Sequence, residues 1–155
     1  MIYTHELTIP KNTTKDKPIH EAMLVSYGFL YKIEIQFPSG CAGLAGIKIF
    51  DGGHQLYPST LGLWFLSDNY TISFDDSILK LTSPFQFDLF GYNLDETYDH
   101  TIYVRAGMVE KEEYISRFLP TIAYDHLMKL IEEEKAKQQE VQAGIIENPF
   151  PWLQQ

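Results

Sequence analysis

The sequence predicts an all-β fold: an antiparallel two-sheet sandwich, jelly-roll or Ig-like, with a helical C-terminal extension. Three observations lead to this. Apolar and polar residues alternate in short segments up to Val109, turn residues separate these segments, and helix-forming residues dominate afterwards. Alternation with a period of two marks a strand with one buried face, and closely spaced turns are typical of sandwiches rather than of βαβ units. We therefore expect a sandwich domain over 1–109 and a helical extension over 110–155.

The first strands are predicted over 2–9, 21–27 and 29–37, and the third of these gives the clearest signal. Its two sides carry Phe29, Tyr31, Ile33, Ile35 and Phe37 on one and Lys32, Glu34 and Gln36 on the other. The other two segments would bury Tyr3, His5, Leu7, Ile9, Met23, Val25 and Tyr27. Because one face of an antiparallel sheet is buried and the other is wet, Ile33 and Ile35 should lie in the core, and Lys32 and Glu34 at the surface.

The middle of the sandwich contains a hairpin signal, in which Gly52 and Gly53 separate strands over 45–51 and 54–58. A short apolar strand is expected over 63–66, and two further strands over 70–74 and 78–81, separated by Asp75-Asp76-Ser77. The last two strands, over 85–92 and 101–109, would bury Phe85, Phe87, Leu89, Ile102, Val104, Ala106 and Met108. The total is eight to ten short strands.

The extension is predicted to contain a short helix over 110–118 and a second helix that begins near Pro120. The second helix starts with an apolar stripe at helical spacing, formed by Ile122, Ala123, His126, Leu127, Leu130 and Ile131. It continues through a charged run over 132–140 that has no apolar face, and Gly144 ends it. We expect the stripe to anchor this helix to the sandwich.

An apolar C-terminal segment follows, and its candidate partner-binding residues are Ile145, Ile146, Phe150, Trp152 and Leu153. Two interpretations remain open. The segment folds back on its own sandwich, or it binds a neighbouring molecule. Aromatic residues next to proline lose little entropy when they are immobilised and are typical of interface hot spots, which favours the second interpretation.

Composition excludes several classes of partner. The formal net charge is −9, from 12 basic and 21 acidic residues, and both sides of Val109 are acidic. Nucleic acid and anionic membranes need a basic surface, so neither is an expected partner. No apolar run approaches the roughly 18–20 residues that cross a bilayer, and the N-terminus lacks the features of a secretory leader. The single cysteine, Cys41, excludes an internal disulfide and a thiolate metal cage.

No catalytic, cofactor-binding or metal-binding residues are predicted, and we do not expect an enzyme. The histidines His5, His20, His54, His100 and His126 lack metal-ligand spacing. Acidic residues collect in expected loops, namely Asp51, Asp68, Asp75, Asp76, Asp95, Glu96 and Asp99. Loop carboxylates could bind Ca²⁺ or form a glycosidase pair, but turns favour Asp for its local hydrogen bonds. Cys41 is expected to be a small buried loop residue rather than a nucleophile.

The aromatic residues allow a binding surface as an alternative. The alternative is that six of them form a platform that stacks on sugars: Tyr57, Trp64, Tyr70, Tyr92, Tyr98 and Tyr103. We expect most of them to be core residues or cross-strand pairs instead.

Four strings carry a resemblance to a known class of proteins. They are IQFPSGCAGL at 35–44, DGGHQLYP at 51–58, SDNYTI at 67–72 and YDHTIYVR at 98–105. Together they resemble small β-sandwich virion proteins encoded by phage-like environmental viruses, over residues 5–109. The resemblance implies a virion component and carries no functional residues with it.

The sequence thus leads us to expect a non-enzymatic structural protein of a virus particle, such as a capsid decoration, minor capsid or connector subunit. It would be made in the host cytoplasm, assemble into the virion as a homo-oligomer, and bind copies of itself or other virion proteins. An acidic exterior would keep it soluble before assembly. The alternative is a carbohydrate- or receptor-binding sandwich module.

Overall fold

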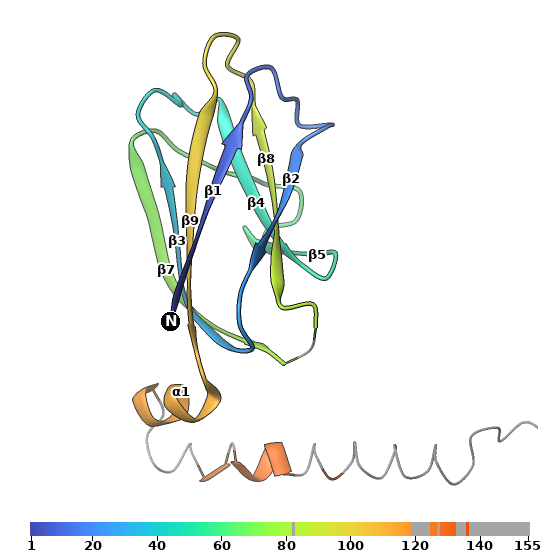
Figure 1. Ribbon diagram of the computed structural model, residues 1–155, viewed down its shortest axis with the longest axis vertical. Helices are drawn as coiled ribbons and strands as arrows, with labels where there is room; N and C mark the ends of the chain where they lie inside the picture. Colours follow the sequence, from blue (N-terminus) through green and yellow to red (C-terminus); the bar gives the residue numbers. More distant parts are fainter. Residues whose placement is uncertain (82, 119–124, 127, 133–135, 137–155) are drawn as a thin grey trace, which may run out of the picture. The chain divides into compact units, whose positions relative to one another are not determined.

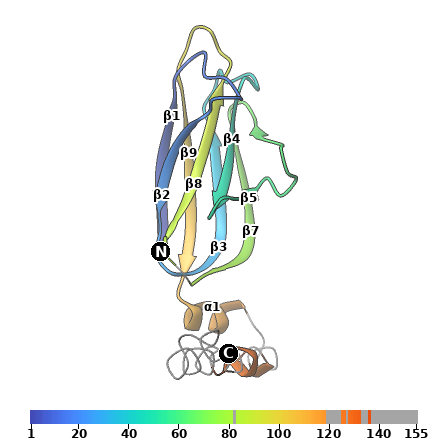
Figure 2. The same cartoon turned by 90° about the vertical axis from the view of Figure 1, so that its right-hand side faces the viewer.

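The computed structural model describes residues 1–81, 83–118, 125–126, 128–132 and 136. The chain forms two compact units, Met1–Lys111 and Glu112–Gln155, and the first unit is a β-sandwich. Figure 1 shows its two sheets, with β7, β3, β9 and β1 on the left and β4, β8, β2 and β5 on the right. Figure 2 shows the same strands from the side.

The first sheet has the order β1-β9-β3-β7, and the second has the order β2-β8-β4-β5, with β6 also paired to β4. The strands of the first sheet are β1 (Ile2–Ile9), β3 (Gly28–Phe37), β7 (Tyr70–Lys80) and β9 (His100–Val109). Those of the second are β2 (Ile19–Leu24), β4 (Ala45–Asp51), β5 (His54–Tyr57), β6 (Phe65–Leu66) and β8 (Gln86–Asn93). All neighbours are antiparallel, which confirms the predicted two-sheet sandwich.

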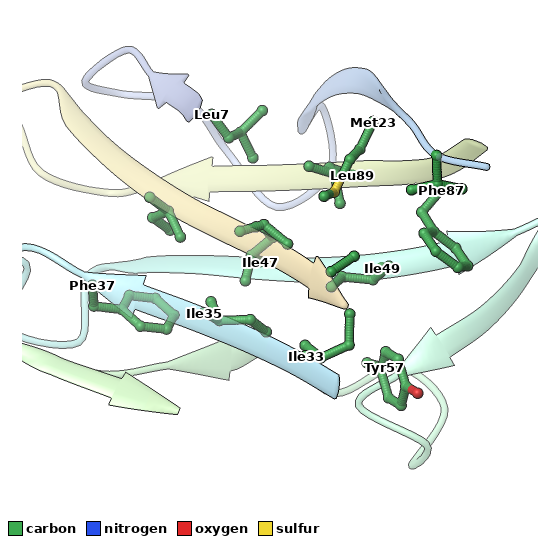
Figure 3. Close-up of a cluster of buried hydrophobic side chains, with 14 of the residues drawn as sticks. Leu7, Met23, Ile33, Ile35, Phe37, Ile47, Ile49, Tyr57, Phe87 and Leu89 are labelled. Carbon is green, nitrogen blue, oxygen red and sulfur yellow. The ribbon is translucent and has the colours of Figure 1, made fainter. Parts of the chain in front are cut away.

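The core lies between the two sheets and consists of the inward-facing residues of both (Figure 3). Ile33 and Ile35 are 1% and 0% exposed, as predicted, and Ile47 and Leu89 face them from the second sheet. Four residues of β9, namely Ile102, Val104, Ala106 and Met108, are fully buried, as the alternation predicted. The hairpin at Gly52 and Gly53 is also confirmed, since both residues adopt the positive φ angles that this turn requires.

Polar pairs also join the sheets. His5 Nε2 on β1 lies 2.8 Å from Glu21 Oε2 on β2. Lys80 Nζ on β7 lies 2.5 Å from Asp51 Oδ1 on β4 and 5.3 Å from the centre of the Phe87 ring. The Lys80 side chain is 5% exposed, so the Asp51 carboxylate is the partner that compensates for the removal of the ammonium group from water.

A β-bulge in β3 makes the prediction for Tyr31 wrong. The pairing register shifts between Leu30 and Lys32 on both sides of the strand. Leu30 is fully buried, whereas Tyr31 lies against Gly107 and lines a surface hollow with Lys32. An extra residue in one strand reverses the alternation, which periodicity alone does not reveal.

The prediction of a break at Asp75-Asp76-Ser77 is also wrong, because β7 is one continuous strand of 11 residues. Alternation persists through the acidic pair, where Asp75 is exposed and Asp76 is half-buried. The Tyr57 hydroxyl donates a hydrogen bond of 2.6 Å to Asp76 Oδ2, which satisfies the carboxylate that interrupts the apolar pattern. Burial and this hydrogen bond raise the pKa of Tyr57 well above its usual value.

Two further residues expected in the core are exposed. Tyr27 is 47% exposed because β2 ends at Leu24, and Phe85 is 37% exposed because it precedes β8. Both residues lie outside a strand, where alternation no longer determines whether a side chain faces the core or the solvent.

The helix α1 (Lys111–Phe118) starts at the last residue of the first unit and otherwise belongs to the second, and it confirms the short helix expected over 110–118. Glu112 and Glu113 lie in its first turn, where carboxylates interact favourably with the helix dipole. Residues 125–126 and 128–132 are helical, and Leu130 of the predicted stripe is 45% exposed. Most of the charged run and the whole C-terminal segment lie outside the described residues.

Candidate functional site

The outer face of the second sheet carries a continuous group of aromatic and basic residues. On β8, Phe87 and Leu89 point into the core, so Phe90 and Tyr92 point outward with Asp88. On β4 the same alternation places Lys48 and Phe50 outward, and Lys48 pairs with Phe90 in the register. We call this surface the aromatic-lysine face, and its residues are Lys15, His20, Lys48, Phe50, Trp64, Phe90 and Tyr92.

Phe90 is the centre of one half of this face. The His20 ring on β2 stacks on it, with ring centres 4.6 Å apart, and the Phe50 ring on β4 meets it edge-on at 5.0 Å. His20 is Phe90's partner in the strand register, so β2, β8 and β4 each contribute one ring. Phe50 and Phe90 remain partly exposed on the surface of the sheet.

Tyr92 is the centre of the other half of this face. One lysine lies over the Tyr92 ring and another over the neighbouring Trp64 ring. Trp64 packs edge-on against Tyr92, with ring centres 4.8 Å apart. Lys48 Nζ lies 4.2 Å from the centre of the Trp64 ring, and Lys15 Nζ lies 4.6 Å from the centre of the Tyr92 ring. Such cation–π contacts favour a charged ammonium at the ring face.

Gly46 makes room for the Tyr92 ring. It is the register partner of Tyr92 on β4, and a Cβ at this position would lie 2.4 Å from a Tyr92 ring carbon. Tyr92 is consequently 1% exposed although it is on the outer face. The buried Tyr92 ring is the surface against which Trp64 and Lys15 pack.

Lys15 and Lys48 are cations with no acidic partner in the part of the chain that the structure describes. None of the ion pairs among the described residues includes either lysine. Burial and the nearby charge of Lys15 lower the pKa of Lys48. Asp88, which points outward on the same sheet face, contacts other residues of that face: its Oδ1 lies 3.0 Å from His20 Nε2 and accepts a hydrogen bond from Gln86.

A second surface feature is a hollow of about 750 Å³ between the loops at one end of the sandwich. These loops are at the top of the ribbon in Figure 1. Asp95 and His100 lie in its wall, with His100 Nε2 3.1 Å from Asp95 Oδ2. The backbone N–H groups of Thr97 and Tyr98 donate to the other Asp95 oxygen, at 2.7 and 3.1 Å. These N–H groups, with a smaller contribution from His100, hold the pKa of Asp95 below its usual value.

The contacts of Asp95 organise the loop over 94–99 rather than activating a reacting group. Asn93, which is fully buried, donates to the carbonyl oxygens of Ile9 and Tyr98 and accepts from the Asp95 N–H. Asp95 and His100 therefore satisfy each other within a structural network.

Cys41 is fully buried beside this hollow, as predicted. Burial, with the charges of Asp68 and Asp95, raises the pKa of its thiol to about 11. A thiol with such a pKa carries almost no thiolate at neutral pH, so Cys41 is a packing residue.

Most of the loop carboxylates make hydrogen bonds within the sandwich, several of them to residues far away in the sequence. Asp68 accepts from the Gly40 N–H at 2.8 Å, and Asp99 accepts from the Lys11 N–H at 2.8 Å. Asp51 and Asp76 bind Lys80 and Tyr57, as described above. Within the part of the chain that the structure describes, no group of three or more His, Cys, Asp or Glu residues is arranged to hold a metal ion.

The six aromatic residues considered for a sugar platform do not lie together. Trp64 and Tyr92 belong to the aromatic-lysine face, Tyr98 and Tyr103 line the hollow at the loop end, and Tyr57 is buried. Tyr70 is 63% exposed on β7. The sequence analysis missed Lys15, His20, Lys48, Phe50 and Phe90. One signal could have indicated this face: Phe90 and Tyr92 occur on the same side of their strand as the polar residues Gln86 and Asp88, and this is the side that faces away from the core.

The candidate partner-binding residues Ile145, Ile146, Phe150, Trp152 and Leu153 lie outside the described residues, so their role stays a prediction. Among the helical residues that the structure describes, no helix has the length and apolar character needed to span a membrane. No family model matches the chain, and no curated protein matches it significantly.

Proposed function

We propose that the protein is a non-enzymatic structural subunit of a virus particle, of the capsid decoration, minor capsid or connector type. The observation that carries this proposal is the self-sufficiency of the sandwich. Among the described residues, its core cluster runs from Leu7 to Met108 and lies within the unit Met1–Lys111. A domain that completes its own core leaves a separate terminal unit available for assembly.

In this proposal the partners are copies of the chain itself or other virion proteins, and the apolar C-terminal segment forms the contact. Ile145, Ile146, Phe150, Trp152 and Leu153 provide apolar area of the kind that forms interface hot spots. The two carboxamide residues that follow, Gln154 and Gln155, offer a matched control because they are polar neighbours of the same segment.

Deletion of residues 145–155 tests this function in the full chain, with the mass in solution as the readout. The expected result is a folded sandwich with an unchanged melting temperature that no longer forms oligomers or binds its particle. The double variant Phe150→Ala/Trp152→Ala should behave like the deletion, whereas Gln154→Ala/Gln155→Ala should assemble normally. Normal assembly of the deletion variant would contradict the proposal, as would its unfolding.

A second candidate function, a carbohydrate- or receptor-binding module, is favoured by the aromatic-lysine face. Rings from three neighbouring strands form a surface suited to contact, together with two lysines that have no ion-pair partner among the described residues. Direct binding measurements with neutral and acidic oligosaccharides test this candidate, and it fails if none of them binds.

A further inference from the structure

The aromatic-lysine face combines two kinds of group that recognise different parts of one ligand. Phe50, Phe90 and Trp64 are apolar and partly exposed. Lys15 and Lys48 lie beside them, each held over a ring at less than 5 Å. A ligand that covers this face must therefore offer apolar surface and negative charge within a short distance of each other.

Two positive charges lie near each other on this face, although the molecule as a whole is acidic. The chain has a net charge of −9, yet these two lysines lie close enough for the charge of Lys15 to lower the pKa of Lys48. Their ammonium groups have no carboxylate within ion-pairing distance among the described residues. An anion between them would supply the missing counter-charge and form charge-assisted hydrogen bonds.

We propose that the aromatic-lysine face binds an acidic saccharide, with Lys15 and Lys48 holding the carboxylate of a uronic-acid unit and the exposed rings of Phe50 and Trp64 contacting sugar rings. This inference rests on the second candidate function and names its ligand class.

Three features favour an acidic saccharide over other anions. Nucleic acids and anionic membranes carry dense negative charge and bind clusters of cations, whereas this face offers two lysines on an acidic protein. A uronic-acid chain carries one charge per sugar and presents apolar C–H surface between charges. Gln86, which lies outward on β8 and donates its amide N–H to Asp88, adds an amide oxygen that can accept a hydrogen bond from a sugar hydroxyl.

The test uses the full chain and two probes that differ only in charge: a β-1,4-linked mannuronate hexamer and the neutral β-1,4-linked mannohexaose. Binding is measured by calorimetry at low salt. We expect the mannuronate hexamer to bind, and the variant Lys48→Gln to weaken its binding about tenfold, as the loss of a charge-assisted hydrogen bond predicts. Lys15→Gln should also weaken it.

Lys32→Gln is the matched control because it removes a lysine from the outer face of the other sheet, and it should leave binding unchanged. Hexaglutamate serves as a probe of charge without sugar rings, and it should bind at least tenfold more weakly than the mannuronate hexamer.

Each contrary result has a distinct meaning. Equal binding of mannohexaose, insensitive to Lys48→Gln, would overturn the recognition of an acidic sugar and leave the saccharide-binding function standing. Binding of neither saccharide would overturn both. Binding of hexaglutamate as tight as that of the mannuronate hexamer would overturn the saccharide and identify an acidic peptide as the ligand.

Discussion

The outer faces of the two sheets differ in the partners of their basic side chains. On the first sheet, Glu34 lies 3.4 Å from Lys32 and 3.9 Å from Arg105, which also donates to Gln36 at 3.0 Å. Across the same sheet Thr8 and Thr101 form a cross-strand hydrogen bond. On the second sheet, Lys48 and Lys15 lie over aromatic rings and have no acidic partner among the described residues.

This difference shows on which face the charged groups already have partners of opposite charge within the isolated molecule. Opposite charges on neighbouring strands neutralise each other and suit a face that stays in water. Partly exposed aromatic rings, with lysines that have no carboxylate partner in the described part of the chain, suit a face that binds a ligand. The inner faces show no such difference, because both are apolar and buried.

The largest effect is expected from the shared core. Ile33→Ala on the first sheet and Ile47→Ala on the second should each lower the free energy of unfolding by about 2–5 kcal/mol, as for other buried large-to-small changes. Denaturant unfolding measures both. Thr4→Ala, at an exposed position of β1, is the control and should cost within about 0.5 kcal/mol. A loss that small for either isoleucine would contradict the common core.

A smaller loss should follow from breaking the ion pair between the sheets. Lys80→Ala leaves the Asp51 carboxylate without its partner and should cost about 1–3 kcal/mol, a value reduced because Asp51 is 31% exposed. Lys32→Ala, which breaks a pair on the outer face, should cost under about 1 kcal/mol. A double-mutant cycle with Asp51→Ala isolates the pair, and equal losses for the two lysines would contradict the distinction.

The loop end should show a pH effect of known sign. The pKa of Asp95 is lowered from 3.8 by the Thr97 and Tyr98 N–H groups, so the folded state favours the charged carboxylate. Its stabilising contribution is present above pH 3.8 and is lost as pH falls through the lower pKa of the folded state. Unfolding followed between pH 5 and pH 2 should therefore show a steeper loss for the wild type than for Asp95→Asn. Parallel curves would contradict this role.

The smallest effect concerns the two lysines of the aromatic-lysine face. Because the charge of Lys15 contributes to lowering the pKa of Lys48, the variant Lys15→Gln should raise the pKa of Lys48 towards 10.5. An NMR titration of the lysine side chains measures this shift. Lys17→Gln removes a charge from the same loop and should leave the pKa of Lys48 unchanged. An equal shift in both variants would mean that only the overall charge matters.

Alternation predicted the sandwich because it depends on burial, which the sequence encodes residue by residue. Ile33, Ile35 and Val104 lie where their pattern put them. The bulge at Tyr31 and the continuity of β7 were not predictable, because they depend on register between strands and on a partner such as Tyr57 for Asp76.

The aromatic-lysine face was only partly predictable. Alternation alone predicts that Phe90 points to the other side of its strand from the buried Leu89, and that Phe50 points to the other side of its strand from the buried Ile49. The meeting of His20, Phe90 and Phe50 requires the order β2-β8-β4, which joins strands far apart in the sequence. The positions of Lys15 and Trp64 depend on loops, for which the alternation makes no prediction.

The fit of Tyr92 against Gly46 has a consequence for how this protein can diverge during evolution. A substitution that adds a side chain at position 46 collides with the Tyr92 ring, whereas a smaller residue at position 92 leaves a gap beneath Trp64. Each single change is therefore costly, and the two together compensate. Among descendants of this sequence, positions 46 and 92 should covary, and lineages that replace the pair should also change Trp64.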